Sequence, residues 1–263
     1  MFTPTEFQLF TKWAMVLAFV CLVAETMMPT GYGRFGEGAT FSVSPRVGWW
    51  LMELPCSVVF PYYFWYRCYW CGDRKLSRSS IVLGCVFSLH YLYRGWYYPY
   101  NLAVFGNSSN FSLLPAVGGW LVTATHAKLN AEVVSAHGRR LTKASYLNTL
   151  QFWVGLCIYY TGLLLIMQQD QIMRDLRSTP GPRYRIPRGG LWDYATSAQY
   201  LSELIGWFGF AVLMDFEANG LFILVVSLCN LVPRAHTNHL WYEKHFGQDY
   251  VDLHRAKLLP GVW

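Results

Sequence analysis

The run YLNTLQFWVGLCIYYTGLLLIMQQ, residues 146–169, decides the fold of this chain because it contains no charged residue over its whole length. A helix rises about 1.5 Å per residue, so this run would extend about 36 Å, enough to cross the roughly 30 Å of hydrocarbon in a bilayer. Further apolar runs lie on both sides of it, at about 9–28, 47–70, 81–98, 113–136, 200–214 and 220–232. Together they predict an all-α integral membrane bundle of seven transmembrane helices. We expect a single domain, 1–263, that ends in a helical tail at 234–263.

The composition supports a membrane protein. Hydrophobic residues make up 54% of the 263 residues and charged residues only 14%, whereas about 25% are charged in an ordinary globular chain. The first run, Leu9–Met28, is not expected to be a signal peptide, because it has no basic start and no small-residue cleavage site before Pro29. The formal charge of +6 is modest, and we expect no nucleic-acid partner.

Two short motifs match known site patterns, but neither is expected to form that site: a dinucleotide-binding fingerprint and a possible metal site. The glycines of Gly31–Gly36, GYGRFG, match the fingerprint of dinucleotide-binding folds, but they follow a membrane helix rather than a strand. A turn, or a loop that lies over a cofactor, remains open for this segment. The pair Cys68-x-x-Cys71 has no second Cys or His pair at metal spacing, and the seven cysteines form no disulfide framework. We therefore expect no metal.

Basic residues are distributed unequally between the two sides that seven crossings define. The side of the C-terminus carries more of them, and a dense group lies between Arg174 and Arg188. The positive-inside rule then places the C-terminus in the cytosol and the N-terminus outside. The glycosylation sequons at Asn107 and Asn110 would face the cytosol and remain unused.

Polar side chains inside the apolar runs mark candidate functional residues. An intramembrane carboxylate such as Glu53 costs about 2.5 to 3.5 kcal/mol to insert, which favours a function over a glutamate that only reaches the interface. His90, Tyr91 and Arg94 share one helical face. Tyrosine and arginine are also common at membrane interfaces, so this second group alone is ambiguous.

The run 113–136 carries further polar residues. Lys128 and Glu132 are spaced i, i+4, so we predict a buried pair in which the two charges neutralise each other. His126 lies in the same run, and Asn130 is a candidate for a side chain that points into a cavity.

Another group of polar residues indicates an anion site on the side of the C-terminus. Arg183–Gly190, RYRIPRGG, offers rigid guanidinium forks that match phosphate oxygens, and glycines that let backbone N–H groups approach an anion. A solvated basic loop at the membrane surface is the alternative. Neighbouring polar residues at helical spacing favour the anion site; they are Asp170, Arg174, Arg177, Gln199, Glu203, Asn230, Arg234, Asn238 and Tyr242.

The order and spacing of several short motifs resemble the steroid 5α-reductases. The motifs are Met52-Glu53-Leu54-Pro55, His90-Tyr91-Leu92-Tyr93-Arg94, Tyr184-Arg185-Ile186-Pro187-Arg188-Gly189-Gly190, Tyr200-Leu-Ser-Glu203, Asn230-Leu-Val-Pro233-Arg234-Ala235, Trp241-Tyr242 and the ending Lys257-Leu-Leu-Pro260. Each motif alone is weak, whereas their joint order is specific. The resemblance covers nearly the whole chain and is strongest after Asp170.

The resemblance implies a seven-helix membrane enzyme that uses NADPH to reduce the C4–C5 double bond of a 3-oxo-4-ene steroid, with cytosolic loops that cover a cofactor cavity. Glu53 and Tyr91 would hydrogen-bond the C3 carbonyl of the steroid. The NADPH site would be lined by Arg94, Asp170, Arg177, Tyr184, Arg185, Gln199, Glu203, Arg234, Asn238 and Tyr242. We expect a monomer in the endoplasmic reticulum of a eukaryote or in the inner membrane of a bacterium.

The chain also departs from the family pattern. Gln199 stands where the family usually has asparagine, Ile166 replaces another asparagine, and Gly206 replaces a glutamate. The family's histidine-rich run becomes His236-Thr-Asn-His239. These changes bear on cofactor affinity and substrate identity rather than on the fold.

Three other functions remain open at the level of sequence. One is reduction of another lipid double bond, as in a 2-enoyl-CoA or a polyprenol. The second is methyl transfer, because isoprenylcysteine methyltransferases also have a basic C-terminal region at the membrane interface. The third is a scaffold or lipid-binding protein without catalytic activity.

Overall fold

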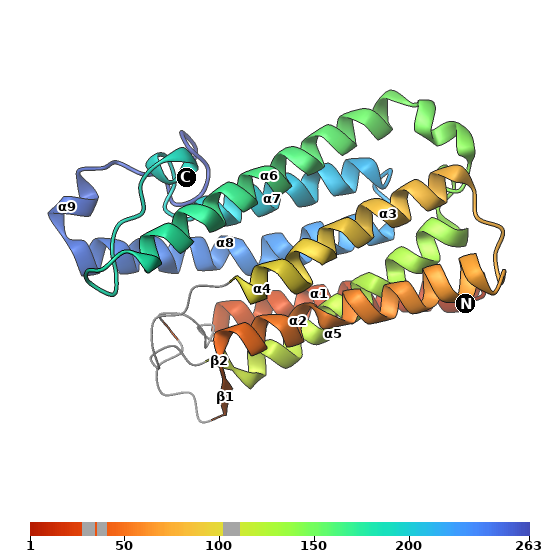
Figure 1. Ribbon diagram of the computed structural model, residues 1–263, viewed down its shortest axis with the longest axis horizontal. Helices are drawn as coiled ribbons and strands as arrows, with labels where there is room; N and C mark the ends of the chain where they lie inside the picture. Colours follow the sequence, from red (N-terminus) through yellow and green to blue (C-terminus); the bar gives the residue numbers. More distant parts are fainter. Residues whose placement is uncertain (28–34, 36–40, 102–110) are drawn as a thin grey trace.

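The computed structural model describes residues 1–27, 35, 41–101 and 111–263, and these form an elongated bundle of long helices (Figure 1). The glycine motif at 31–36, apart from Phe35, and the sequons at Asn107 and Asn110 lie outside the described residues. The prediction of an all-α fold is confirmed.

A helical segment lies at each of the seven predicted runs within the described part of the chain. These segments are α1 (Pro4–Met27), α2 with η2 (Pro45–Phe60, Pro61–Trp70), α3 with η3 and α4 (Arg78–Leu92, Tyr93–Tyr97, Tyr98–Tyr100), α5 with η4 (Leu113–Glu132, Val133–His137), α6 (Leu150–Ser178), α7 (Ala198–Leu213) and α8 (Ala218–Phe246). The short elements are β1 (Ser42–Val43), β2 (Phe111–Ser112), η5 (Ala144–Asn148), η6 (Gly190–Asp193) and α9 (Gln248–Val251).

Hydroxyl side chains begin several of these helices. The hydroxyl of Ser44 accepts a hydrogen bond from the N–H of Val47 at the start of α2, and proline occupies the first helical position there. Thr149 accepts from the N–H of Phe152 in the same way at the start of α6. Such caps satisfy N–H groups that have no partner inside the helix.

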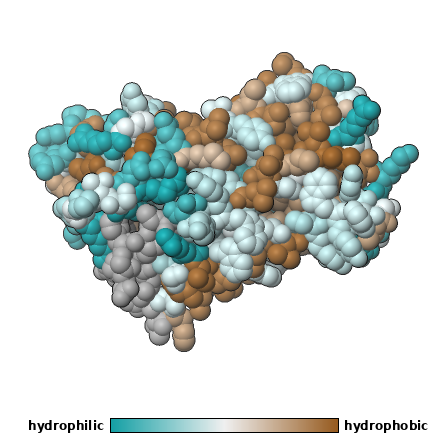
Figure 2. Space-filling view, in the orientation of Figure 1, coloured by the Kyte–Doolittle hydropathy of each residue, from teal (hydrophilic) through white to brown (hydrophobic). Residues whose placement is uncertain are grey.

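Three helical stretches in the described residues are long and apolar enough to cross a membrane: Pro4–Ala24, Leu150–Ser178 and Ala218–Phe246. The chain is therefore a membrane protein. Figure 2 shows apolar surface over the middle of the bundle and hydrophilic residues gathered mainly toward its ends. Exposed aromatic side chains, including Trp70 and Tyr100 at 81% exposure each, suit the two interfaces of a bilayer.

Close backbone contact joins α6 to α7. A Cβ atom added to Gly162 on α6 would lie 2.2 Å from the backbone nitrogen of Gly206 on α7. One added to Gly209 would lie 2.3 Å from the backbone nitrogen of Tyr159. Only glycine permits this distance between the two helices, and small residues at such contacts are typical of membrane bundles.

Helix α8 joins the predicted last span, 220–232, to the first part of the predicted helical tail. It continues through Pro233 as far as Phe246. Since the helix is continuous, Asn230, Arg234 and Asn238 do lie at i+4 spacing along it.

The two chain termini lie at opposite ends of the bundle (Figure 1). The connections after η2, after η4 and between α7 and α8 lie at the end of the bundle where the N-terminus lies. Residues 179–197, α9 and the C-terminus lie at the other end. Near this second end, β1 pairs with β2 in antiparallel register, Ser42 opposite Ser112. The helices thus alternate in direction along the chain.

Candidate active site

The hydroxyl of Tyr91 lies inside the bundle, where α3 faces α5. The Tyr91 side chain is 3% exposed, and its hydroxyl oxygen is 3.0 Å from Nδ1 of His126, a fully buried residue of α5. Cys56 of α2 belongs to the same buried cluster, and its Sγ donates to the carbonyl of Thr123 at 3.2 Å. The rings of Phe87 and Trp207 pack around the tyrosine–histidine pair. Apolar surroundings of this kind strengthen a hydrogen bond relative to the same bond in water.

Arg94 joins two carboxylates that are far apart in the sequence. Its Nη2 is 3.9 Å from Oε1 of Glu53 on α2 and 3.8 Å from Oε2 of Glu203 on α7. The guanidinium carbon lies 4.8 Å from the ring centre of Tyr98 and 5.5 Å from that of Trp49. The structure thus brings together three charged residues that the sequence marked separately.

A small cavity of about 10 Å³ lies beside Arg94, with room for roughly one water molecule. It is lined by His90, Arg94, Tyr159, Leu163, Ile166, Glu203, Gly206 and Trp207. Ile166 and Gly206, two of the departures from the family pattern, therefore lie on the wall of one cavity. A ligand much larger than water requires some of these side chains to move.

Asp170 connects α6 to two neighbouring segments. Its Oδ2 accepts a hydrogen bond from the Tyr93 hydroxyl at 3.0 Å, and its Oδ1 accepts from Nε2 of Gln199 at 2.6 Å. The glutamine that replaces the family's asparagine thus bonds to this carboxylate. One turn further along α6, Nη1 of Arg174 is buried and has no hydrogen-bond partner among the described residues.

Tyr184 and Arg185 lie between the end of α6 and helix α8. The Arg185 guanidinium donates to the carbonyl of Leu176 and, at 2.9 Å, to that of Thr179. These bonds satisfy carbonyls that have no partner at the helix end. The Tyr184 ring packs edge to face against Trp241, with 5.1 Å between ring centres.

The rest of the Arg183–Gly190 stretch is held by the C-terminal tail and by the turn that directly follows the stretch, η6. Arg255 donates to the carbonyl of Pro187 at 2.9 Å, and the N–H of Gly189 donates to Asp193 at 2.9 Å. Gly189 and Gly190 have φ angles of 89° and 56°, which only glycine adopts without strain. The segment is therefore an ordered loop against the tail.

Helix α8 contributes the remaining predicted residues. Nδ2 of Asn238 is 3.3 Å from the hydroxyl of Tyr200, and the guanidinium carbon of Arg234 lies 5.6 Å from the ring centre of Tyr200. Tyr200 and Glu203 are less than one turn apart on α7. Through these two residues, Asn238 and Arg234 of α8 are connected to Arg94, which lies 3.8 Å from Glu203. Tyr242 is buried and stacks on the ring of Tyr250.

His126 has no predicted role, although the structure pairs it with Tyr91. A histidine inside an apolar run was the available signal. In the described residues, Tyr91 forms a hydrogen bond with His126 and none with Glu53. The contact of Glu53 and Tyr91 with a substrate stays a prediction.

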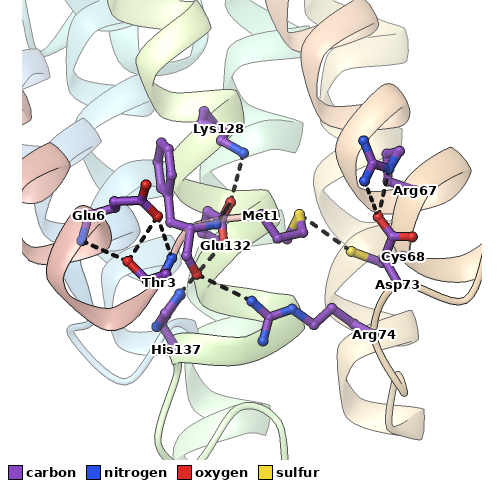
Figure 3. A network of polar contacts seen from close by, with 11 residues as sticks. Met1, Thr3, Glu6, Arg67, Cys68, Asp73, Arg74, Lys128, Glu132 and His137 are labelled. Atoms are coloured by element: carbon purple, nitrogen blue, oxygen red, sulfur yellow. Dashed lines mark hydrogen bonds and ion pairs between the residues drawn. The ribbon is translucent and has the colours of Figure 1, made fainter.

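The pair of Lys128 and Glu132 is confirmed. Nζ of Lys128 is 2.7 Å from Oε1 of Glu132, whose side chain is fully buried. Figure 3 shows this pair at the end of the N-terminus, with His137 and Arg74 nearby. Asn130, a candidate for a cavity, instead donates to the carbonyl of His126 and accepts from Asn219.

Comparison with known proteins identifies the family. The model of the family described as 3-oxo-5-alpha-steroid 4-dehydrogenase matches residues 115–263. A steroid 5-alpha-reductase of Solanum lycopersicum is 32% identical, over 97% of this chain and 98% of the relative. A 3-oxo-5-alpha-steroid 4-dehydrogenase 1 of Mus musculus is 30% identical, over 93% and 92%. The chain therefore belongs to the steroid 5α-reductase family, oxidoreductases that act on a CH–CH bond.

Proposed function

We propose that this protein reduces the C4–C5 double bond of 3-oxo-4-ene steroids with NADPH as the reductant. The observation that carries the proposal is the Tyr91 hydroxyl, which is buried inside the bundle together with an arginine-bearing cluster, in a chain of this family. A lipid-soluble substrate can reach such a depth from the bilayer.

The reaction requires a hydrogen-bond donor at the substrate carbonyl. Two electrons and one hydrogen are added to C5 as a hydride, and the π electrons of the C4–C5 bond move toward the C3 oxygen. The Tyr91 hydroxyl donates to this oxygen as its negative charge grows. A proton from solvent then adds to C4, which gives the saturated ketone. One preorganised donor of this kind typically lowers the barrier by roughly 2.7 to 4 kcal/mol.

Glu53 is assigned to the same carbonyl. A carboxylate that carries a negative charge would repel the growing charge on the oxygen, so Glu53 acts as a donor only in its protonated form. When Glu53 is ionised, its negative charge is offset by Arg94, which lies 3.9 Å away.

The residues around Arg94 fit a dinucleotide phosphate with a nicotinamide ring. NADPH supplies the hydride when it is bound. Three buried polar atoms near the predicted site have no partner among the described residues, namely Nη1 of Arg174, Oδ1 of Asn230 and Oε1 of Gln169. They offer one guanidinium donor for a phosphate and two amide oxygens for N–H groups of the ligand. Arg177, Tyr184, Arg185, Arg234, Asn238 and Tyr242 are proposed to hold the rest of the cofactor.

We also propose that all seven helical segments cross the membrane, with the C-terminus in the cytosol and NADPH entering from that side. The opposite placement of the two termini supports an odd number of crossings (Figure 1). The endoplasmic reticulum and the bacterial inner membrane both suit this arrangement.

The substrate class is tested with purified protein in lipid nanodiscs. NADPH oxidation is followed with a 3-oxo-4-ene steroid, a 2-enoyl-CoA or a polyprenal, and the products are identified by mass spectrometry. We expect reduction of the steroid alone. Turnover of only one of the other substrates would replace the steroid in this proposal, and adenosylmethionine binding without NADPH binding would indicate a methyltransferase.

The role of Tyr91 is tested by Tyr91→Phe, which removes one oxygen and little volume. The rate of steroid reduction should fall by about 100-fold or more, while NADPH still raises the unfolding temperature. Tyr100→Phe is the control, because Tyr100 is 81% exposed. Unchanged turnover in Tyr91→Phe would refute this mechanism.

A further inference from the structure

The strongest unassigned feature is the contact between Tyr91 and His126. The two atoms, the Tyr91 hydroxyl oxygen and Nδ1 of His126, are 3.0 Å apart and come from different helices. Both side chains are buried, and His126 has no exposed surface. The other ring nitrogen, Nε2 of His126, has no hydrogen-bond partner among the described residues.

The unpaired Nε2 atom bears on which ring nitrogen carries the proton when a substrate is bound. A neutral imidazole has one N–H group, and its other nitrogen is an acceptor. In the free protein each tautomer leaves one buried donor without a described partner, the Nε2–H group in one form and the Tyr91 hydroxyl hydrogen in the other. With a substrate carbonyl bound at Tyr91, the Nδ1–H form leaves only an acceptor unpaired, whereas the Nε2–H form still leaves a buried N–H without a partner. Unpaired buried N–H groups are the rarer case in folded proteins. With substrate bound the Nδ1–H form is therefore favoured, and it donates to the oxygen of Tyr91.

The direction of this hydrogen bond sets the direction of the next one. When His126 donates to the Tyr91 oxygen, the phenol hydrogen cannot point back at His126 and is available to a substrate carbonyl. Consecutive hydrogen bonds of this kind also polarise and strengthen one another. His126 therefore makes Tyr91 a better donor.

Packing holds the His126 ring in this orientation. The rings of Trp207, Phe210 and Phe222 surround it, with centres 5.6, 5.7 and 6.3 Å away. The carbonyl of His126 accepts a hydrogen bond from Asn130 one turn further along α5. Because neighbouring aromatic rings fill the space around it, the imidazole has little freedom to turn away from Tyr91.

We propose that His126 is a positioning residue for the reduction: its Nδ1–H orients the Tyr91 hydroxyl toward the substrate carbonyl and stabilises the charge that the phenol oxygen gains in the transition state. His126 itself exchanges no proton with the substrate. This inference rests on the proposed function, in which Tyr91 is the donor to the C3 oxygen.

Two amide substitutions separate the orienting bond from mere packing. The N–H₂ group of asparagine can occupy the place of Nδ1, whereas that of glutamine extends toward the place of Nε2. His126→Asn should keep kcat within about 3-fold of the parent, whereas His126→Gln should lower kcat by about 10-fold to 100-fold, the range of an orienting hydrogen bond. The KM for NADPH should change little in either variant. His137→Gln is the control for loss of a partly buried imidazole away from Tyr91.

The double variant with Tyr91→Phe tests whether His126 acts through Tyr91. If it does, His126→Gln causes no further loss of rate in the Tyr91→Phe background, measured in single turnover. Equal rates for the Asn and Gln variants at matched unfolding temperatures, or multiplicative losses in the double variant, would overturn this inference alone. Full activity of Tyr91→Phe would overturn the proposed mechanism and this inference together.

Discussion

Arg94 is the residue on which the buried charges of the site converge. It has two carboxylate neighbours, Glu53 at 3.9 Å and Glu203 at 3.8 Å, and two aromatic neighbours. A buried carboxylate without a cation is strongly unfavourable, and one guanidinium here compensates the buried Glu53 and the partly exposed Glu203. The same cation is suitably placed to meet a ligand in the adjacent cavity.

Replacement of Arg94 by methionine, which has a similar length, should destabilise the protein. Two carboxylates would lose their cation, and breaking a buried ion pair costs about 3–5 kcal/mol. Thermal unfolding in detergent measures the effect. The triple variant that adds Glu53→Gln and Glu203→Gln should recover most of the lost stability, because no unpaired charge remains. A triple variant no more stable than Arg94→Met would show that packing, not charge, explains the loss.

At this scale the sequence predicted which polar residues lie inside the bundle better than which of them are in contact. Glu53 and Arg94 were marked by their depth in apolar runs, and the structure does place them together. The partner of Tyr91 is His126, on another helix. Helical spacing gives the face of one helix, but the rotation of each helix about its axis depends on packing against all its neighbours.

The contact between α6 and α7 is the element-scale feature that positions the site, because α6 carries Asp170 and α7 carries Gln199 and Glu203. The two helices meet through glycines, but the two sides of the contact are unequal. A Cβ on Gly162 would lie 2.2 Å from Gly206, whereas a Cβ on Gly206 would have its nearest neighbour at 3.7 Å.

Gly162→Ala should therefore destabilise the protein and Gly206→Ala should not. The first forces the helices apart and costs about 1–3 kcal/mol as overpacking; the second makes an ordinary contact. Gly118→Ala is a further control, because nothing lies within 4 Å of its added Cβ. Unfolding temperatures of the three variants in one detergent measure the difference. Equal losses for Gly162→Ala and Gly206→Ala would contradict this packing.

The helices themselves were largely predictable, because long apolar runs determine them. Their ends were less so. The predicted last span stops at residue 232 and the predicted helical tail begins at 234, whereas the structure has one helix, α8, that continues through Pro233 to Phe246. Proline removes one hydrogen bond, and the remaining helix is held by its contacts with α7 and with the tail. Sequence alone does not weigh a lost hydrogen bond against such packing.

At the scale of the whole molecule, the two ends of the bundle differ in chemistry. At the end of the bundle where the N-terminus lies, charged residues form salt bridges with one another, such as Lys128 with Glu132 and Arg140 with Asp215. The opposite end holds Arg177, Arg185 and Arg234, which the proposed function assigns to NADPH. If NADPH comes from the cytosol, the end of the bundle where the C-terminus lies must face the cytosol.

This orientation predicts opposite accessibility for two points on the chain. In sealed vesicles whose outer face is the cytosolic one, protease should remove an epitope tag added after Trp263. Cys71, exposed at the end of η2, lies at the other end and should react with a membrane-impermeant maleimide only after detergent opens the vesicles. Cys71→Ser identifies the labelled residue. Reaction of both points in sealed vesicles would contradict an odd number of crossings, and the reverse pattern would place the proposed NADPH site on the side without the cofactor.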